Sequence, residues 1–153
     1  MTPRLDFLQA SPDAIKAMMG LNFVDQSGLD HRLLELVKMR TSQLNGCAYC
    51  LDMHSKDARA QGETEQRLYA LDAWHEAPFY SDSERAALAW TEAVTQVDQG
   101  HVPDALYEEA RKHFGERELT NLTLAIVVTN GWNRLCIAFR AVAGSYQPAK
   151  QAA

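Results

Sequence analysis

The chain has 153 residues, 46% of them hydrophobic, which is enough to build the core of one domain without metals or disulfides. Its net charge of -5 at pH 7 gives no sign of a phosphate-binding surface, so a nucleic acid is not an expected partner. The N-terminus lacks a signal-peptide pattern and no apolar run approaches the length of a membrane span, so we expect a cytoplasmic protein that does not enter a membrane.

Apolar residues recur at helical spacing in the first part of the chain. The sequence SPD at residues 11–13 is a helix start signal, and apolar residues then continue to Phe23. A second helix is predicted after Gly28 and ends in the Asn-Gly turn at residues 45–46. A third begins near Cys47 and stops at Gly62.

Four more helices are predicted in the rest of the chain. Thr64 opens a short one, and the sequence SDSE at residues 81–84 forms a capping box for the next. Pro103 starts a sixth, and the last spans residues 116–143, where only Gly131 could interrupt the apolar period. The sequence therefore predicts an all-α fold in which residues 1–153 form a single domain of about seven helices.

The sequence CAYCLDMH at residues 47–54 places Cys47 and Cys50 three residues apart and His54 one helical turn later. A structural disulfide here would close a very small loop, contribute roughly 2 kcal/mol at most, and tend to be reduced in the cytosol. A zinc site needs four ligands, and the remaining cysteine, Cys136, stands alone in the long apolar helix, so we expect no metal site. A reactive dithiol accounts for all the residues of the motif.

The start of the third helix suits such a dithiol. Unpaired backbone N–H groups and the helix dipole stabilise a thiolate there, and cysteines three residues apart can form and break a disulfide. His54 lies on the same face and could accept the thiol proton. The preceding helix offers Asp30 and Glu35 as acids that could orient this base. Alternatively, His54 is a solvated histidine on the helix surface and Glu35 is a surface carboxylate.

The stretch ELVKMRTSQLNGCAYCLDMH, residues 35–54, resembles the core of the alkylhydroperoxidase D-like branch of the carboxymuconolactone decarboxylase family. That branch has a glutamate twelve positions before a CxxC pair and a histidine four positions after it, and this chain matches at Glu35, Cys47, Cys50 and His54. ARAQG after the motif, ERAALAWTEAVT at residues 84–95 and WNRL at residues 132–135 are also similar to small members. The resemblance covers most of the chain.

The resemblance implies a thiol-dependent peroxidase with an all-helical, oligomeric fold. Carried over by position, Cys50 attacks the hydroperoxide, Cys47 resolves the sulfenic acid into a disulfide, and His54 with Glu35 forms a proton relay. No cofactor is implied beyond this redox-active pair, which needs an external thiol or lipoyl-type reductant. Tyr49 stands where the best-known members have a second histidine, and a phenol with a pKa of about 10 cannot replace it as a base at neutral pH.

Two other functions remain open. The decarboxylase branch of the family acts on a small lactone acid without a redox thiol pair, and its dicarboxylate substrate would need converging cations, for which Arg40 and Arg134 are the candidates. The chain could also be a non-catalytic redox sensor whose disulfide changes its packing.

Whatever the function, we expect self-association, because the helix at residues 116–143 is apolar nearly all round and a small domain cannot cover every face. The resemblance implies trimers or hexamers.

Overall fold

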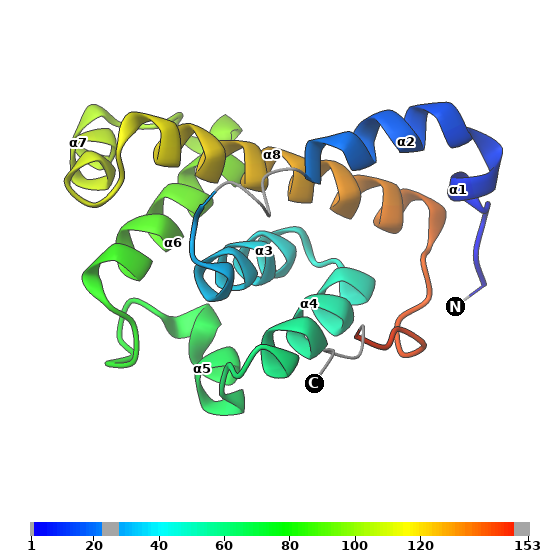
Figure 1. Ribbon diagram of the computed structural model, residues 1–153, viewed down its shortest axis with the longest axis horizontal. Coiled ribbons are helices and arrows are strands. Elements are labelled where there is room, and N and C mark those ends of the chain that lie inside the picture. The colour runs from blue at the N-terminus through cyan, green and yellow to red at the C-terminus, as the bar shows by residue number, and fades with distance from the viewer. Residues whose placement is uncertain (1, 23–27, 149–153) are drawn as a thin grey trace.

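The computed structural model describes residues 2–22 and 28–148, and every regular element in these ranges is a helix (Figure 1). The α-helices are α1 (Phe7–Ala10), α2 (Pro12–Gly20), α3 (His31–Asn45), α4 (Ala48–Ala60), α5 (Glu65–Ala70), α6 (Asp82–Thr95), α7 (Asp104–His113) and α8 (Glu116–Phe139). Two short 3-10 helices, η2 (Leu71–Ala73) and η3 (Val97–Gln99), follow α5 and α6. The expected all-α fold is confirmed.

Helix α1 was not predicted from the sequence, and neither were the two 3-10 helices. Helix α1 has four residues, too few to show an apolar period. Asp6 caps it by accepting hydrogen bonds from the backbone N–H groups of Leu8 and Gln9, at 3.1 and 3.2 Å. Phe23, to which we extended the first predicted helix, lies outside the described residues.

Two helix boundaries follow signals that are visible in the sequence. The Ser81 hydroxyl accepts a hydrogen bond from the N–H of Glu84 at 3.3 Å, and the Glu84 carboxylate accepts one from the N–H of Ser81 at 2.7 Å. This is the expected capping box of α6. Gly46 ends α3 in the left-handed conformation, with φ 68°, which glycine adopts without steric cost.

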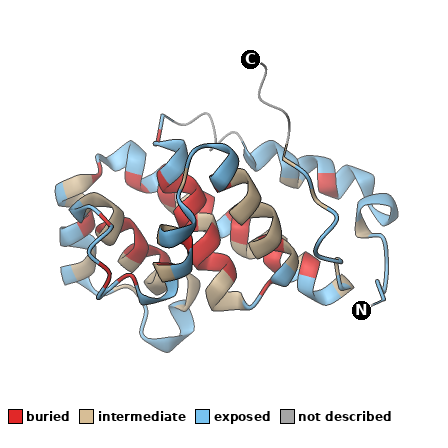
Figure 2. Ribbon diagram, turned by 90° about the horizontal axis from the view of Figure 1, so that it is seen from below, coloured by how far each residue is buried: buried red, intermediate tan, exposed pale blue. Residues whose placement is uncertain are grey.

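Helix α3 is at the centre of the fold. It packs against α4, α6 and α8, which lie around it in Figure 1. Its Leu36 and Val37 are completely buried, the first in a cluster with Leu88 of α6 and the second in a cluster with Leu122 and Ile126 of α8. Figure 2 shows the buried residues gathered where these helices meet. Polar side chains on the inner face of α3, among them Glu35, are therefore largely shielded from bulk solvent.

Helix α8 is long and apolar enough to cross a membrane by length and composition alone. Several of its residues are buried inside the protein, however, including Leu122 and Ile126 in the core beside α3. Gly131 does not interrupt it, and a Cβ atom at this position would lie 2.6 Å from Cε of Met18, so the end of the Met18 side chain lies directly against the glycine. The helix ends at Phe139, earlier than the predicted residue 143. These features are those of a core helix.

Candidate active site

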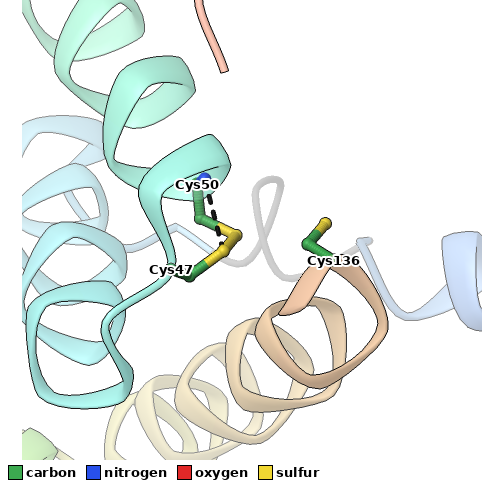
Figure 3. A group of neighbouring side chains, drawn as sticks. All are labelled: Cys47, Cys50 and Cys136. Carbon is green, nitrogen blue, oxygen red and sulfur yellow. Dashed lines mark hydrogen bonds between the residues drawn. A yellow bond between two sulfur atoms is a disulfide. The ribbon is translucent and has the colours of Figure 1, made fainter. Parts of the chain in front are cut away.

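Cys47 and Cys50 are joined by a disulfide at the start of α4 (Figure 3). Cys47 caps the helix, and its Sγ accepts a hydrogen bond from the backbone N–H of Cys50 at 3.4 Å. Both residues are buried. The first turn of a helix presents unpaired N–H groups, so this position stabilises a thiolate when the pair is reduced.

Three asparagines that were not predicted as site residues fix the turn before Cys47. The side-chain NH₂ of Asn45, at the end of α3, donates to the carbonyl oxygens of Asn130 and Asn133 on α8, at 3.0 and 2.9 Å. Asn133 is completely buried and donates to the Ser42 hydroxyl at 3.2 Å. The signal for this network was the presence of two amides inside an apolar helix. The network ties the thiol-bearing turn to α8.

The expected contact between Glu35 and His54 is present. Glu35 Oε2 lies 3.1 Å from His54 Nδ1, and Glu35 Oε1 accepts a hydrogen bond from Lys38 Nζ at 3.0 Å. Burial is the largest single influence on the pKa of Glu35 and raises it, but the hydrogen bonds and charges of His54 and Lys38 together outweigh burial and hold the pKa below its ordinary value. The ionised carboxylate makes Nδ1 a donor and leaves Nε2 of His54 to accept a proton.

Asp57 and Tyr146, which belong to no motif in the sequence, extend this polar group. The Tyr146 hydroxyl donates to both carboxylate oxygens of Asp57, at 2.8 and 3.0 Å. Side-chain atoms of Glu35, His54 and Asp57 lie within 4.8 Å of one another. Burial raises the pKa of Asp57, and the charge of Glu35 adds to this effect. Asp57 follows His54 by three residues and so shares its helix face, but nothing in the sequence indicated Tyr146.

A cavity of about 750 Å³ lies beside these groups, and Glu35, Cys50 and His54 all line it. Cys47 is not among the described residues of its wall. Much of the remaining wall is apolar and comes from α1, α2, α4 and α8, with Phe7, Leu8, Met19, Met53 and Trp132. An organic molecule of moderate size could therefore reach the Cys50 side of the disulfide.

Tyr49 also lines this cavity. Burial raises the pKa of its phenol, and the neighbouring Cys136 and Asp52 raise it further. The hydroxyl is therefore protonated at neutral pH and can donate a hydrogen bond to an oxygen in the cavity, but it cannot serve as a base.

Cys136 is not isolated, contrary to what the sequence suggests. Its sulfur lies within 4.8 Å of those of both Cys47 and Cys50, and the three side chains form one buried cluster against Phe7 and Tyr49 (Figure 3). Burial raises the pKa of the Cys136 thiol to about 11. The long range of this contact, from α8 to the start of α4, explains why local spacing did not reveal it.

The other charged residues considered from the sequence lie elsewhere. Arg40 is buried and paired with Glu92, its Nε donating at 2.9 Å, and Arg134 is exposed and bonded to Asn130 of its own helix. Neither lines the cavity. Asp30 caps α3 by accepting a hydrogen bond from the N–H of Arg32 at 2.7 Å, so it does not orient His54.

Similarity to known proteins fixes the family. The sequence model of the carboxymuconolactone decarboxylase family matches residues 12–93, more than half of the chain, and this region includes Glu35, both cysteines of the pair and His54. The chain belongs to this family. Its CxxC-histidine pattern and its relatives are those of the alkylhydroperoxidase D-like (AhpD-like) branch, as the sequence resemblance indicated.

Three similar proteins define how far this likeness extends. The uncharacterized protein YdfG of Bacillus subtilis is 45% identical over 139 residues, which cover 90% of this chain and 95% of that protein. The crystal structure of an Agrobacterium tumefaciens protein of unknown function, a candidate antioxidant defence protein AhpD, matches with a TM-score of 0.89 at 42% identity, covering 97% of this chain and 100% of that one. Alkyl hydroperoxide reductase AhpD of Mycobacteroides abscessus is 36% identical over 66 residues, 42% of this chain and 38% of that protein.

Proposed function

We propose that the protein is a thiol-dependent peroxidase that reduces hydroperoxides through a Cys50–Cys47 dithiol/disulfide cycle. One observation carries this proposal: Cys50, paired with Cys47, lines the same cavity as the Glu35–His54 pair. A nucleophile, a base and the group that orients the base are thus brought to one space that a substrate can enter.

Cys50 is the attacking thiol in this proposal, because it lines the cavity and Cys47 does not among the described wall residues. His54 accepts the thiol proton, and the thiolate attacks one peroxide oxygen. The O–O bond breaks, Cys50 becomes a sulfenic acid, and the departing alkoxide takes the proton back from His54 and leaves as the alcohol.

Cys47 is the resolving thiol. Its sulfur attacks the Cys50 sulfenic acid, water leaves, and the disulfide forms. The Cα atoms of the two residues are 5.3 Å apart, inside the range of roughly 4.4–6.8 Å that disulfides usually span. The first turn of α4 stabilises the thiolates of both steps.

An external dithiol must then return the pair to its reduced form. A thiol or lipoyl-type reductant suits this step, since a slender dithiol can enter the cavity and attack the disulfide at Cys50. A cytoplasmic location belongs to the proposal, because thiol reductants are available there. No cofactor takes part in it.

Lactone decarboxylation is the less favoured function. A small dicarboxylate needs cations that converge on its two carboxylates, but Arg40 and Arg134 both lie away from the cavity wall. A buried dithiol beside the substrate space has no part in that reaction.

Thiol counting tests the proposal. Reduced protein is treated with one equivalent of an organic hydroperoxide, and thiols are counted before and after. We expect two thiols per chain to disappear, one alcohol to form, and turnover to continue when a dithiol is supplied. Loss of thiols without turnover would indicate a redox sensor, and unchanged thiols would rule out peroxidase activity.

A further inference from the structure

We infer that the reduced protein binds one thiophilic metal ion, with Zn²⁺ as the probe, between the sulfurs of Cys47, Cys50 and Cys136. This site goes beyond the proposed peroxidase cycle, which makes no use of Cys136. The inference rests on the meeting of three sulfurs from two distant parts of the chain, the start of α4 and the last turns of α8, all within 4.8 Å of one another (Figure 3).

The spacing of the sulfurs suits a metal once the disulfide is reduced. Zinc–sulfur bonds of about 2.3 Å in tetrahedral geometry put neighbouring sulfurs about 3.8 Å apart. Reduction separates Cys47 Sγ and Cys50 Sγ, while Cys136 Sγ is already within 4.8 Å of both. Small side-chain rotations therefore bring the three sulfurs to the spacing of a zinc site, and the backbone need not move.

The surroundings stabilise the negative charge of the site. Three thiolates and one Zn²⁺ carry a net charge of −1, and the first turn of α4 faces that charge with its unpaired N–H groups. One of these, the N–H of Cys50, already donates to the sulfur of Cys47 at 3.4 Å. Such N–H to sulfur contacts strengthen thiolate ligands, as groups just outside a metal site commonly do.

The cavity supplies a route for the ion. Cys50 and Cys136 both line it, whereas Cys47 is buried and is not among the described residues of its wall. A three-sulfur site leaves one position for a fourth ligand, which solvent in the cavity can occupy. The site is thus buried on its protein side and open on the other.

A second group of possible ligands lies nearby but is less suited to a thiophilic ion. Glu35, His54 and Asp57 offer mainly oxygen, and their atoms are engaged, Glu35 by Lys38 and Asp57 by the Tyr146 hydroxyl. Thiolates select soft ions such as Zn²⁺ over carboxylates. A metal titration therefore distinguishes the three-cysteine cluster from the Glu35–His54–Asp57 group, because substitutions in only one of them should weaken zinc binding.

Zinc and the disulfide exclude each other, because both use the sulfurs of Cys47 and Cys50. Oxidation of the pair forms the sulfur–sulfur bond, removes two ligands and releases the ion. Bound zinc, in turn, blocks attack by Cys50. Metal binding is measured without any peroxide, so its failure can be told apart from a failure of the proposed activity.

The test is a titration of the fully reduced chain with Zn²⁺ against a chromophoric chelator, in the absence of oxygen. We expect one ion per chain, no binding to the oxidised protein, and a loss of affinity in Cys136→Ala beyond the roughly 10- to 100-fold typical of losing a group outside the ligand shell. With Co²⁺ as a spectroscopic probe, the sulfur-to-metal absorption should fall to about two thirds in Cys136→Ser, since two of three thiolates remain.

Three results would overturn the inference. These are an absence of binding by the reduced wild type, equal affinity in Cys136→Ala, and loss of binding in His54→Asn but not in Cys136→Ala, which would move the ion to the carboxylate group. X-ray absorption at the zinc edge covers the case in which a Cys136 variant does not fold. It needs only the wild type, and fewer than three sulfur neighbours would contradict the site.

Discussion

Glu35 and His54 are 19 positions apart in sequence, one on α3 and the other on α4, yet their side chains meet at 3.1 Å on the wall of the cavity that Cys50 lines. The left-handed Gly46 turn makes this possible, because it directs α4 back along α3. Lys38 shares the carboxylate with His54, so the carboxylate keeps its charge in a buried setting.

Replacing Glu35 by Gln should slow the oxidation of Cys50 without unfolding the protein. The neutral glutamine side chain lacks the negative charge that stabilises a protonated His54 through Nδ1, so His54 becomes a poorer base. We expect a decrease of about 10-fold or more, part of the roughly 10²- to 10⁴-fold that acid–base catalysis supplies. Stopped-flow thiol loss measures the rate. Glu63→Gln is the matched control, because Glu63 is equally buried and ion-paired with Arg67 but does not line the cavity.

The same carboxylate should make stability depend on pH. The pKa of Glu35 is lowered in the folded protein, so its stabilising contribution is fully present above the unfolded value, 4.5, and is lost as the pH falls through the lowered folded value. The difference in Tm between wild type and Glu35→Gln should therefore shrink below about pH 4.5. Thermal unfolding over pH 3–7 measures it, and a difference that grows toward low pH would contradict the assignment.

The roles of the two paired cysteines can be separated. Cys50→Ser should abolish peroxide reduction, whereas Cys47→Ser should still form a sulfenic acid that a trapping reagent captures. Cys136 does not substitute for Cys47 at neutral pH, because burial raises its pKa to about 11 and keeps it protonated. Equal trapping in wild type and Cys50→Ser would reverse the assignment.

Local signals in the sequence predicted α2 to α8 and the Cys47–Cys50–His54 motif, since caps, turns and i, i+3 or i, i+4 spacing act within a few residues, but they missed the four-residue α1. The burial of Glu35 was left open by the sequence, because spacing does not exclude a surface carboxylate, and it depends on how α4, α6 and α8 pack around α3. The contacts of Cys136 and Tyr146 could not be predicted, because they depend on how α8 and the segment after it return to α4. The sequence therefore predicts the motif, whereas its neighbours Cys136 and Tyr146 depend on the packing of α8 and of the segment that follows it.

Cys136 should resist alkylation in the folded, reduced protein. All three cysteines are buried, so exposure does not set Cys136 apart, but with a pKa of about 11 its thiolate fraction at pH 7 is on the order of 10⁻⁴, whereas the start of α4 stabilises the thiolates of the other two. At pH 7 a small alkylating agent should modify Cys47 and Cys50 first and Cys136 only after unfolding, and labelling of Cys136 in the folded protein should begin only as the pH rises toward 11. Peptide mass spectrometry gives the order of labelling, and fast native labelling of Cys136 at pH 7 would refute this.

The protein should self-associate through α8. Leu122 and Ile126 of this helix are buried in the core, but Val127 and Ile137 are exposed by 51% and 46%, an apolar surface that a second copy can cover. Light scattering at micromolar concentration should give a multiple of 17.1 kDa, with a trimer or hexamer expected. Val127→Asp should reduce the mass toward that of one chain, because association would bury its charge without a partner. Val97→Asp is the control, since Val97 is 49% exposed but belongs to η3 and not to α8, and it should leave the assembly intact. A wild-type mass of 17.1 kDa would refute association, and equal effects of the two variants would place the interface elsewhere.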